Sequence, residues 1–233
     1  MAKKGKSYHL KRIAVKSVLP IRKKKQKVFL VSPRAGPHPK KESLALAVLI
    51  RDELGLAKDF SEARKLIKKG YVLVDGRVSK DPKRPIGFLD IIEIKPLNKF
   101  WRMEIINGKL KANEISKSTV KYCKVIGKHV IKKGRISISL HDGKNILADN
   151  NVKVGDSVKI SLPHYKLVNL IKLQTGANCY IFKGKHAGKF AILKNIVEQR
   201  GSMGSIAVLE DKDKKEILTS LNYIMVIDNE FSG

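Results

Sequence analysis

The sequence predicts an α+β fold, in which a basic arm precedes a small α/β module, a central β-barrel domain and a second small β-barrel. The arm is indicated by charge, because residues 1–41 hold 14 Lys and Arg and no acid, half of the net charge of +28. Helical periodicity after Glu42 indicates the module, and short apolar strands between glycine turns from Phe100 onward indicate the β domains. We expect the four parts to span residues 1–41, 42–105, 106–172 and 173–233.

The composition indicates which class of partner the chain binds. With 49 Lys and Arg against 21 Asp and Glu, a compact monomer would repel itself unless a polyanion neutralised it, and nucleic acid is the natural polyanion. A membrane surface is the alternative anion, but no basic stretch carries the apolar face of an interfacial helix. The polar start and the lack of an apolar run of membrane length predict a soluble, intracellular protein.

The two cysteines, Cys123 and Cys179, indicate no metal site. They are far apart in the sequence, and neither has a second Cys or a His at zinc-ligand spacing. We expect both to be small buried apolar residues, and the sequence predicts neither a metal nor any other cofactor.

The arm mixes cations with apolar and aromatic side chains. Its four prolines would break any long helix, so the arm alone should be largely disordered and contribute little core. A solubilising tail would not need Tyr8, Ile13, Val28 and Phe29 among its charges, whereas folding against RNA uses such side chains. The arm residues expected to bind RNA are Lys3, Lys4, Lys6, His9, Lys11, Arg12, Lys16, Arg22, Lys23, Lys24, Lys25, Lys27, Arg34, Lys40 and Lys41.

Two helices are predicted after the arm. The first has an apolar stripe that runs from Leu44 to Leu54, and Gly55 stands where a helix C-cap belongs. The second begins at Asp59, whose side chain should accept hydrogen bonds from the first free backbone N–H groups while Glu62 reaches back. Gly70 closes its other end.

The second helix separates apolar from basic residues. Its inward side is predicted to hold Ala63, Leu66 and Ile67, and its opposite side Arg64, Lys65, Lys68 and Lys69. The like-charge pair Arg64 and Lys68 should cost about 0.3 kcal/mol, a penalty that phosphate contact would reverse.

A hairpin with an Asp75–Gly76 turn follows at residues 71–78, and one more strand follows at residues 87–94. Two short helices followed by Val-x-Val-Asp-Gly-x-Val resemble the S-four-like RNA-binding module, an alpha-L fold found in ribosomal proteins, tyrosyl-tRNA synthetases and pseudouridine synthases. In that family the second helix and the hairpin line an RNA groove. The RNA contacts expected here are Arg64, Lys65, Lys68, Lys69, Arg77, Lys80, Lys83 and Arg84. A small α/β domain with a solvated basic helix is the alternative.

The middle of the chain predicts a small β barrel. Short strands near residues 101–106, 125–126, 136–140 and 158–162 are separated by turn pairs such as Asn107–Gly108. Asp142, Asp149 and Asp156 could bind a cation, but turn chemistry explains them more simply.

The end of the chain contains a basic glycine turn between two apolar strands, at residues 176–196. The run Gly184-Lys-His-Ala-Gly188-Lys189 resembles the KOW motif of ribosomal proteins and transcription elongation factors, which implies an SH3-like barrel. The glycines would let backbone N–H groups approach phosphates. The residues expected to bind RNA are Lys183, Gly184, Lys185, His186, Gly188 and Lys189. An ordinary hairpin is the alternative.

Essentially the full chain resembles the e-type family of ribosomal protein four of archaeal and eukaryotic small subunits. The order of the parts carries this resemblance, together with runs such as Leu140-His-Asp-Gly-Lys-Asn-Ile146. It implies a non-catalytic constituent of the cytoplasmic small ribosomal subunit that binds ribosomal RNA and neighbouring ribosomal proteins, supports assembly and translation, and takes no small-molecule substrate. The lack of a longer tail after Gly233 favours an archaeal source. The arm departs from the family where Val15-Lys-Ser-Val-Leu19 precedes Pro20.

Two other functions compete with this one. An accessory to an RNA-modifying enzyme is the first, but the chain has Gly134-Arg-Ile-Ser137 where pseudouridine synthases carry a catalytic Asp, and it shows no other catalytic signature. The second is a KOW-type transcription or translation factor, which a partner-binding groove would favour over a basic arm.

Overall fold

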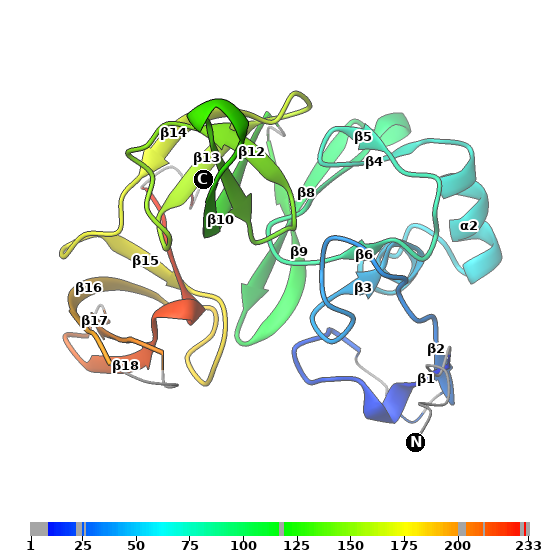
Figure 1. Ribbon diagram of the computed structural model, residues 1–233. Helices are drawn as coiled ribbons and strands as arrows, with labels where there is room; N and C mark the ends of the chain where they lie inside the picture. Colours follow the sequence, from blue (N-terminus) through cyan, green and yellow to red (C-terminus); the bar gives the residue numbers. More distant parts are fainter. Residues whose placement is uncertain are drawn as a thin grey trace, which may run out of the picture. The chain divides into compact units, whose positions relative to one another are not determined.

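The computed structural model describes residues 9–21, 25, 27–116, 119–199, 204–211, 213–228 and 231. These residues form two compact units, and strands far outnumber helices in them (Figure 1). The first unit contains the described residues up to Met103 together with Lys109–Glu114. The second contains Glu104–Gly108 together with the described residues from Ile115 onward. Within these described segments, no helix is long and apolar enough to cross a membrane.

The first unit begins with short strand pairs. Strand β1 (Leu10–Lys11) pairs with β2 (Phe29–Leu30), and β3 (Leu44–Ala45) pairs with β6 (Pro85–Ile86). Helix α1 (Leu46–Val48) continues into the π-helical turn η2 (Leu49–Glu53), and α2 spans Phe60–Lys68. The expected first helix is therefore shorter than predicted, because pairing with β6 holds residues 44–45 as a strand. The short 3-10 helices are η1 (Arg12–Ala14), η3 (Lys95–Leu97), η4 (Lys132–Gly134) and η5 (Leu221–Tyr223).

A five-stranded sheet completes the first unit. Its order is β5-β4-β7-β8-β9, from β4 (Val72–Val74), β5 (Arg77–Val78), β7 (Ile91–Ile94), β8 (Lys99–Ile106) and β9 (Lys109–Ile115). The predicted Asp75–Gly76 turn joins β4 to β5, with φ of 52° and 74° at its two residues. The predicted Asn107–Gly108 turn joins β8 to β9, with φ of 50° and 70°. Two successive positive φ values define the tight hairpin turn that these dipeptides favour.

The prediction that the arm contributes little core is wrong. Four apolar arm residues, Val15, Leu19, Ile21 and Leu30, are buried. The backbone N–H of Leu110, in β9, also donates to the carbonyl of Val18. Burial of each side chain contributes about 1.5 to 3 kcal/mol, so these contacts hold the described part of the arm to the first unit without RNA. By contrast, Ile13, Val28 and Phe29 are exposed, as interleaved RNA-facing side chains would be.

The capping prediction for α2 is wrong in its detail. Asp59 is the N-cap, but its side chain makes no capping hydrogen bond. Glu62 instead accepts a hydrogen bond from the backbone N–H of Lys58, at 2.8 Å. The carboxylate of Glu62 therefore stabilises the chain one residue earlier than the predicted capping box.

The second unit contains two further five-stranded sheets. The first has the order β12-β11-β10-β13-β14, and its edge strands β12 and β14 contact each other, so the sheet is strongly curled. Its strands are β10 (Val120–Val130), β11 (Ile136–Leu140), β12 (Asn145–Ala148), β13 (Ser157–Ser161) and β14 (Lys166–Ile171). Its core includes Cys123, Val125, Ile138 and Val158, all fully buried.

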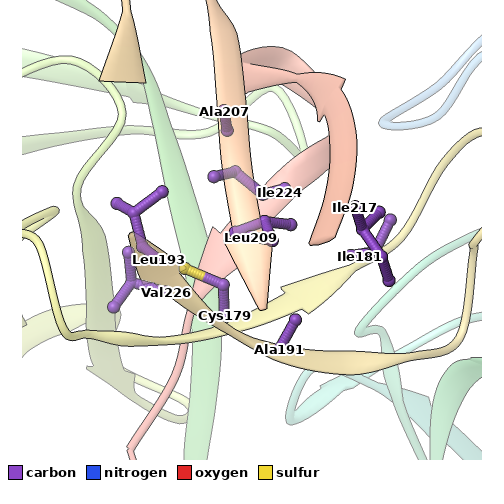
Figure 2. Packing of buried hydrophobic residues seen from close by; sticks show 9 residues of the cluster. All are labelled: Cys179, Ile181, Ala191, Leu193, Ala207, Leu209, Ile217, Ile224 and Val226. Atoms are coloured by element: carbon purple, nitrogen blue, oxygen red, sulfur yellow. The ribbon is translucent and has the colours of Figure 1, made fainter. Parts of the chain in front are cut away.

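The last sheet has the order β18-β17-β16-β15-β19. Its strands are β15 (Asn178–Ile181), β16 (Phe190–Val197), β17 (Ile206–Glu210), β18 (Glu216–Ser220) and β19 (Ile224–Val226). Figure 2 shows its core, where the sulfur of Cys179 lies among aliphatic side chains that include Leu193 and Val226. Both cysteines are 0% exposed, which confirms that they are buried apolar residues.

Candidate nucleic-acid interface

Helix α2 presents an unbroken basic surface. Ala63 and Ile67 are fully buried, which fixes the rotation of the helix about its axis. On the other side Arg64, Lys65, Lys68 and Lys69 are all exposed, as predicted. These four cations, which we call the α2 basic face, have no acidic partner in the ion pairs found among the described residues.

The hairpin after α2 adds to this surface. Gly70 ends the helix with a φ of +78°, a conformation that favours glycine, and a Cβ there would lie 3.9 Å from Cε of Lys80. The Lys80 side chain is therefore beside the last turn of α2. The ammonium of Lys69 lies 5.9 Å from the ring centroid of Tyr71. Arg77, on β5, is also exposed.

A second group of cations lies where the arm meets the module. The backbone N–H of Arg34 donates to the carbonyl of Lys83 at 2.9 Å, and the Arg34 guanidinium is 3.8 Å from Asp81. Lys83 also lines a pocket with His9, Phe29 and other residues of the arm. The His9 and Phe29 rings are 5.6 Å apart, so aromatic and cationic groups converge there.

The other predicted RNA-binding cations of the first unit differ in how much of them a ligand can reach. Arg12 is only 7% exposed, and its Nε is buried without a hydrogen-bond partner. Arg84 is half-buried, and its Nε is likewise buried without a partner. Lys11, Lys16, Lys25, Lys27, Lys40 and Lys41 are exposed. Lys3, Lys4, Lys6, Arg22, Lys23 and Lys24 lie outside the described residues.

The glycine turn between β15 and β16 is partly occupied by the protein's own contacts. Gly188 has a φ of +95°, and a Cβ there would lie 2.7 Å from the carbonyl oxygen of Ile105. Its backbone N–H donates to the carbonyl of Ile181 at 2.7 Å. The prediction that glycine N–H groups face phosphates is therefore wrong at Gly188, where glycine is required because another backbone approaches closely.

The segment that approaches Gly188 is the end of the β8–β9 hairpin, Glu104–Gly108, which belongs to the second unit. The N–H of Gly108 donates to the carbonyl of Ala187 at 3.0 Å. The Tyr180 hydroxyl donates to the carbonyl of Ile105 and accepts from its N–H. The hairpin end is thus fixed by both backbone and side-chain hydrogen bonds.

The residues of the glycine turn differ in their exposure and in whether their charge is paired. Gly184 and Lys185 are exposed, and Lys183 and His186 are half-buried. Lys189 is exposed but forms an ion pair with Asp211 at 2.9 Å. The hydrogen bond to Asp211 raises the pKa of Lys189, so its charge is already compensated.

Three lysines of the central sheet are buried, which the sequence analysis missed. The Lys121 ammonium is 3.1 Å from Asp142, and both side chains are fully buried. Lys124 donates to the carbonyls of Leu221 and Ile224 at 2.9 and 2.8 Å. Lys159 forms an ion pair with Asp228, which also accepts a hydrogen bond from Tyr122.

Burial and nearby charges shift the pKa values of Lys124, Asp142 and Tyr122. Burial lowers the pKa of Lys124 to about 8. Burial alone would raise the pKa of Asp142, but the charges of Lys121 and Lys144 outweigh it and lower that pKa well below its ordinary value. Burial and the hydrogen bond to Asp228 raise the pKa of Tyr122 to about 12.

Two of the three aspartates considered as cation ligands, Asp142 and Asp156, have structural partners. Asp142 also accepts a hydrogen bond from the N–H of Lys144, as turn residues do. Asp156 accepts from the N–H groups of Lys153 and Leu173. In the part of the chain that the structure describes, no group of three or more His, Cys, Asp or Glu residues is arranged to hold a metal ion.

Comparison with known proteins gives matches over nearly the whole chain. The family model described as "S4 domain" matches residues 46–92, and the model described as "Ribosomal family S4e" matches residues 100–167. The small ribosomal subunit protein eS4 of Methanocaldococcus jannaschii is 39% identical over 99% of this chain and 98% of its own length. The protein of the same name from Methanothermobacter thermautotrophicus is 37% identical over 96% of this chain and 93% of its own length.

A solved structure agrees with these matches. The 30S ribosomal protein S4e from Thermoplasma acidophilum aligns with a TM-score of 0.69 and 29% identity, over 82% of this chain and 97% of that one. The S4-domain match falls on the segment in which the sequence analysis predicted an S-four-like module, so that prediction is confirmed.

Proposed function

This chain belongs to the ribosomal S4e family, and from that premise we propose that it is a structural constituent of the small ribosomal subunit that binds ribosomal RNA. The observation that carries the proposal is the identity of 35 to 39% to small-subunit proteins over nearly their full length. The chain would act in the cytoplasm, beside neighbouring ribosomal proteins, and would support subunit assembly and translation. Its relatives are named as ribosomal proteins rather than as enzymes, so neither an RNA-modifying role nor a transcription role is favoured.

The α2 basic face is the first RNA-binding element that we assign. Four exposed cations that pair with no acid in the described part of the chain can contact several phosphates at once, and Lys80 and Arg77 extend the same surface. Each such contact releases counterions from the RNA, which supplies affinity that depends on salt. The exposed arm cations, with Arg34 and Lys83, form a second element that continues along the same unit.

The last sheet is assigned as an SH3-like KOW barrel. Its support is the glycine turn between β15 and β16, flanked by the strands that the motif requires. Lys185 and His186 would carry its RNA contacts, since Gly188 and Lys189 are engaged within the protein. The division at residues 41, 105 and 172 remains our proposal for the arm, module, central domain and KOW domain.

Sedimentation of cell extract tests the proposal. We expect the protein to sediment with the small subunit at moderate salt and to be released at high salt, because phosphate contacts weaken as salt rises. A matched sample treated with ribonuclease should lose the association at every salt concentration. Recovery in the free pool, while assembled small subunits lack the protein, would contradict it.

A further inference from the structure

The hairpin formed by β10 and β11 lies in a stretch of the folded chain that has no acidic residue. Between Glu114 and Asp142 the sequence has seven Lys and Arg and no Asp or Glu. Two of the seven, Lys121 and Lys124, are buried in the central sheet. The cations at the end of the hairpin, by contrast, are exposed to solvent.

The geometry of the hairpin concentrates three cations at its end. Val130 pairs with Ile136, and the N–H of Ile131 donates to the carbonyl of Arg135 at 2.8 Å, which closes the turn. Lys133 and Gly134 have φ values of 65° and 69°, so the turn is tight. Lys132, Lys133 and Arg135 are all exposed within four residues on a hydrogen-bonded ribbon.

These three cations have no compensating charge. None of them forms an ion pair or a side-chain hydrogen bond with any residue that the structure describes. Lys128, earlier on β10, differs because its ammonium donates to the backbone and side-chain oxygens of Asn150 at 2.7 and 2.8 Å. Neutral acceptors leave its charge in place, so the ribbon is positively charged along its length.

Apolar side chains are exposed beside the cations. Val130 is 74% exposed and Ile126 is 58% exposed, on the strand that leads to the turn. A ligand that offers phosphates together with less polar sugar edges suits this combination. The minor groove of double-stranded RNA is wide and shallow, displays ribose 2′-hydroxyls and base edges between the phosphate backbones, and is recognised mostly by shape rather than by sequence.

The β17–β18 hairpin of the same unit has similar geometry but a different charge. Lys214 has a φ of 58°, Lys215 is exposed, and the N–H of Asp211 donates to the carbonyl of Lys215 at 3.0 Å. Glu210, Asp213 and Glu216 surround this pair of lysines in the sequence. The two hairpins therefore differ mainly in whether acids accompany their lysines.

We propose that the β10–β11 hairpin is an RNA-binding element separate from the α2 basic face and the glycine turn, with double-stranded RNA as its ligand. Lys132, Lys133 and Arg135 contact phosphates on either side of a minor groove, and Val130 lies against the sugar edges. The inference rests on the proposed function and adds a surface in the second unit to it.

The first experiment removes two of the three positive charges of the turn without changing its backbone. In the full chain, Lys132→Gln with Lys133→Asn removes two charges, and Asn tolerates the positive φ of position 133. The matched control is Lys215→Gln with Lys214→Asn. Filter binding to an in vitro transcript of the organism's own small-subunit ribosomal RNA is measured from low to high salt, with circular dichroism to check the fold.

We expect the slope of log affinity against log salt to fall by about 1.4 to 1.8 in the β10–β11 variant, with binding roughly 25- to 60-fold weaker at 0.1 M salt. The β17–β18 control should keep the wild-type slope. A second variant, Val130→Thr, keeps a β-branched residue and should weaken binding several-fold at unchanged slope.

The outcomes separate this inference from the proposed function. If the wild-type chain binds the transcript no better than an unrelated RNA, the proposed function fails. If the wild-type chain binds specifically and the β10–β11 variant binds equally well with the same slope, only the hairpin inference is overturned. A variant that binds the transcript normally but is not incorporated into subunits would also overturn it, since its partner would then be a protein.

Discussion

Helix α2 and the central sheet carry the same residue type in opposite roles. On α2 the cations are exposed and have no acidic partner among the described residues, whereas Lys121, Lys124 and Lys159 in the central sheet are buried and have partners. Lysine content alone therefore overstates the charge that a nucleic acid can reach. The buried lysines act as hydrogen-bond donors that hold the fold together, and the exposed ones keep a charge that phosphates can reach.

The largest expected effect is the loss of stability in Lys121→Ala. It leaves the buried carboxylate of Asp142 with only the partly exposed Lys144, 3.0 Å away, so the free energy of unfolding should fall by about 3 kcal/mol or more. Denaturant unfolding measures it. The double variant Lys121→Met with Asp142→Leu should recover most of the loss, because it removes both buried charges. An unchanged midpoint in Lys121→Ala would show that the pair contributes nothing.

For the α2 basic face we expect a large loss of RNA affinity with little loss of stability. Arg64→Glu with Lys68→Glu should lower RNA affinity about 100-fold, or about 3 kcal/mol, because two phosphate contacts become repulsive. Thermal stability should change by no more than about 0.5 kcal/mol, since both side chains are exposed. Filter binding and a melting curve on the same sample show whether this face binds RNA or stabilises the fold. If the variant loses stability but each folded molecule keeps its RNA affinity, the α2 basic face has a structural role instead.

A smaller effect should appear in the pH dependence of stability. The pKa of Lys124 is about 8 in the folded chain and about 10.5 when unfolded, so between these values the unfolded chain binds more protons. Lys124 therefore contributes a rise in the free energy of unfolding with pH across this window, by about 2 kcal/mol relative to the Lys124→Met variant, whereas Cys179, whose pKa burial raises to about 12, contributes a fall at the upper end of the window. Lys124→Met should remove the rise, and Lys166→Met, an exposed lysine of the same sheet, should keep it. If the rise persists in Lys124→Met, other titratable groups cause it.

The smallest effect separates two lysines of the glycine turn. Lys185 is exposed without an ion pair in the described structure, whereas Lys189 pairs with Asp211. Lys185→Gln should lower the slope of log affinity against log salt by about 0.7 to 0.9, and Lys189→Gln should lower it less. Salt titrations of both variants measure the difference. Equal slopes would mean that Asp211 releases Lys189 when RNA binds.

Local features were predicted correctly from the sequence because their causes are local. The Asp75–Gly76 and Asn107–Gly108 turns follow from the backbone freedom of their own residues. The rotation of α2 follows from the spacing of Ala63 and Ile67. The S-four-like module could be recognised because these local signals occur in its characteristic order.

The roles of particular cations could not be predicted because their partners are distant in the sequence. Both faces of β10 are buried over residues 121–125, so alternation along the strand does not distinguish Lys124 from its apolar neighbours. The carbonyl acceptors of Lys124 lie 97 and 100 residues further along the chain. Gly188 was misinterpreted for the same reason, since only the fold brings Ile105 to it.

The hydrogen bonds between Ile105 and Tyr180 also set an order of events during synthesis. These residues are 75 positions apart, so the end of the β8–β9 hairpin leaves the peptidyl transferase centre long before its partner exists. At about 5 to 20 residues per second, the interval is about 4 to 15 s. During that time the strands beside β8 can already pair, but the Tyr180 hydroxyl that bonds the backbone of Ile105 has not yet been made. The β8–β9 hairpin, which begins in the first half of the chain, therefore gains its last hydrogen bonds only when the second half has been made.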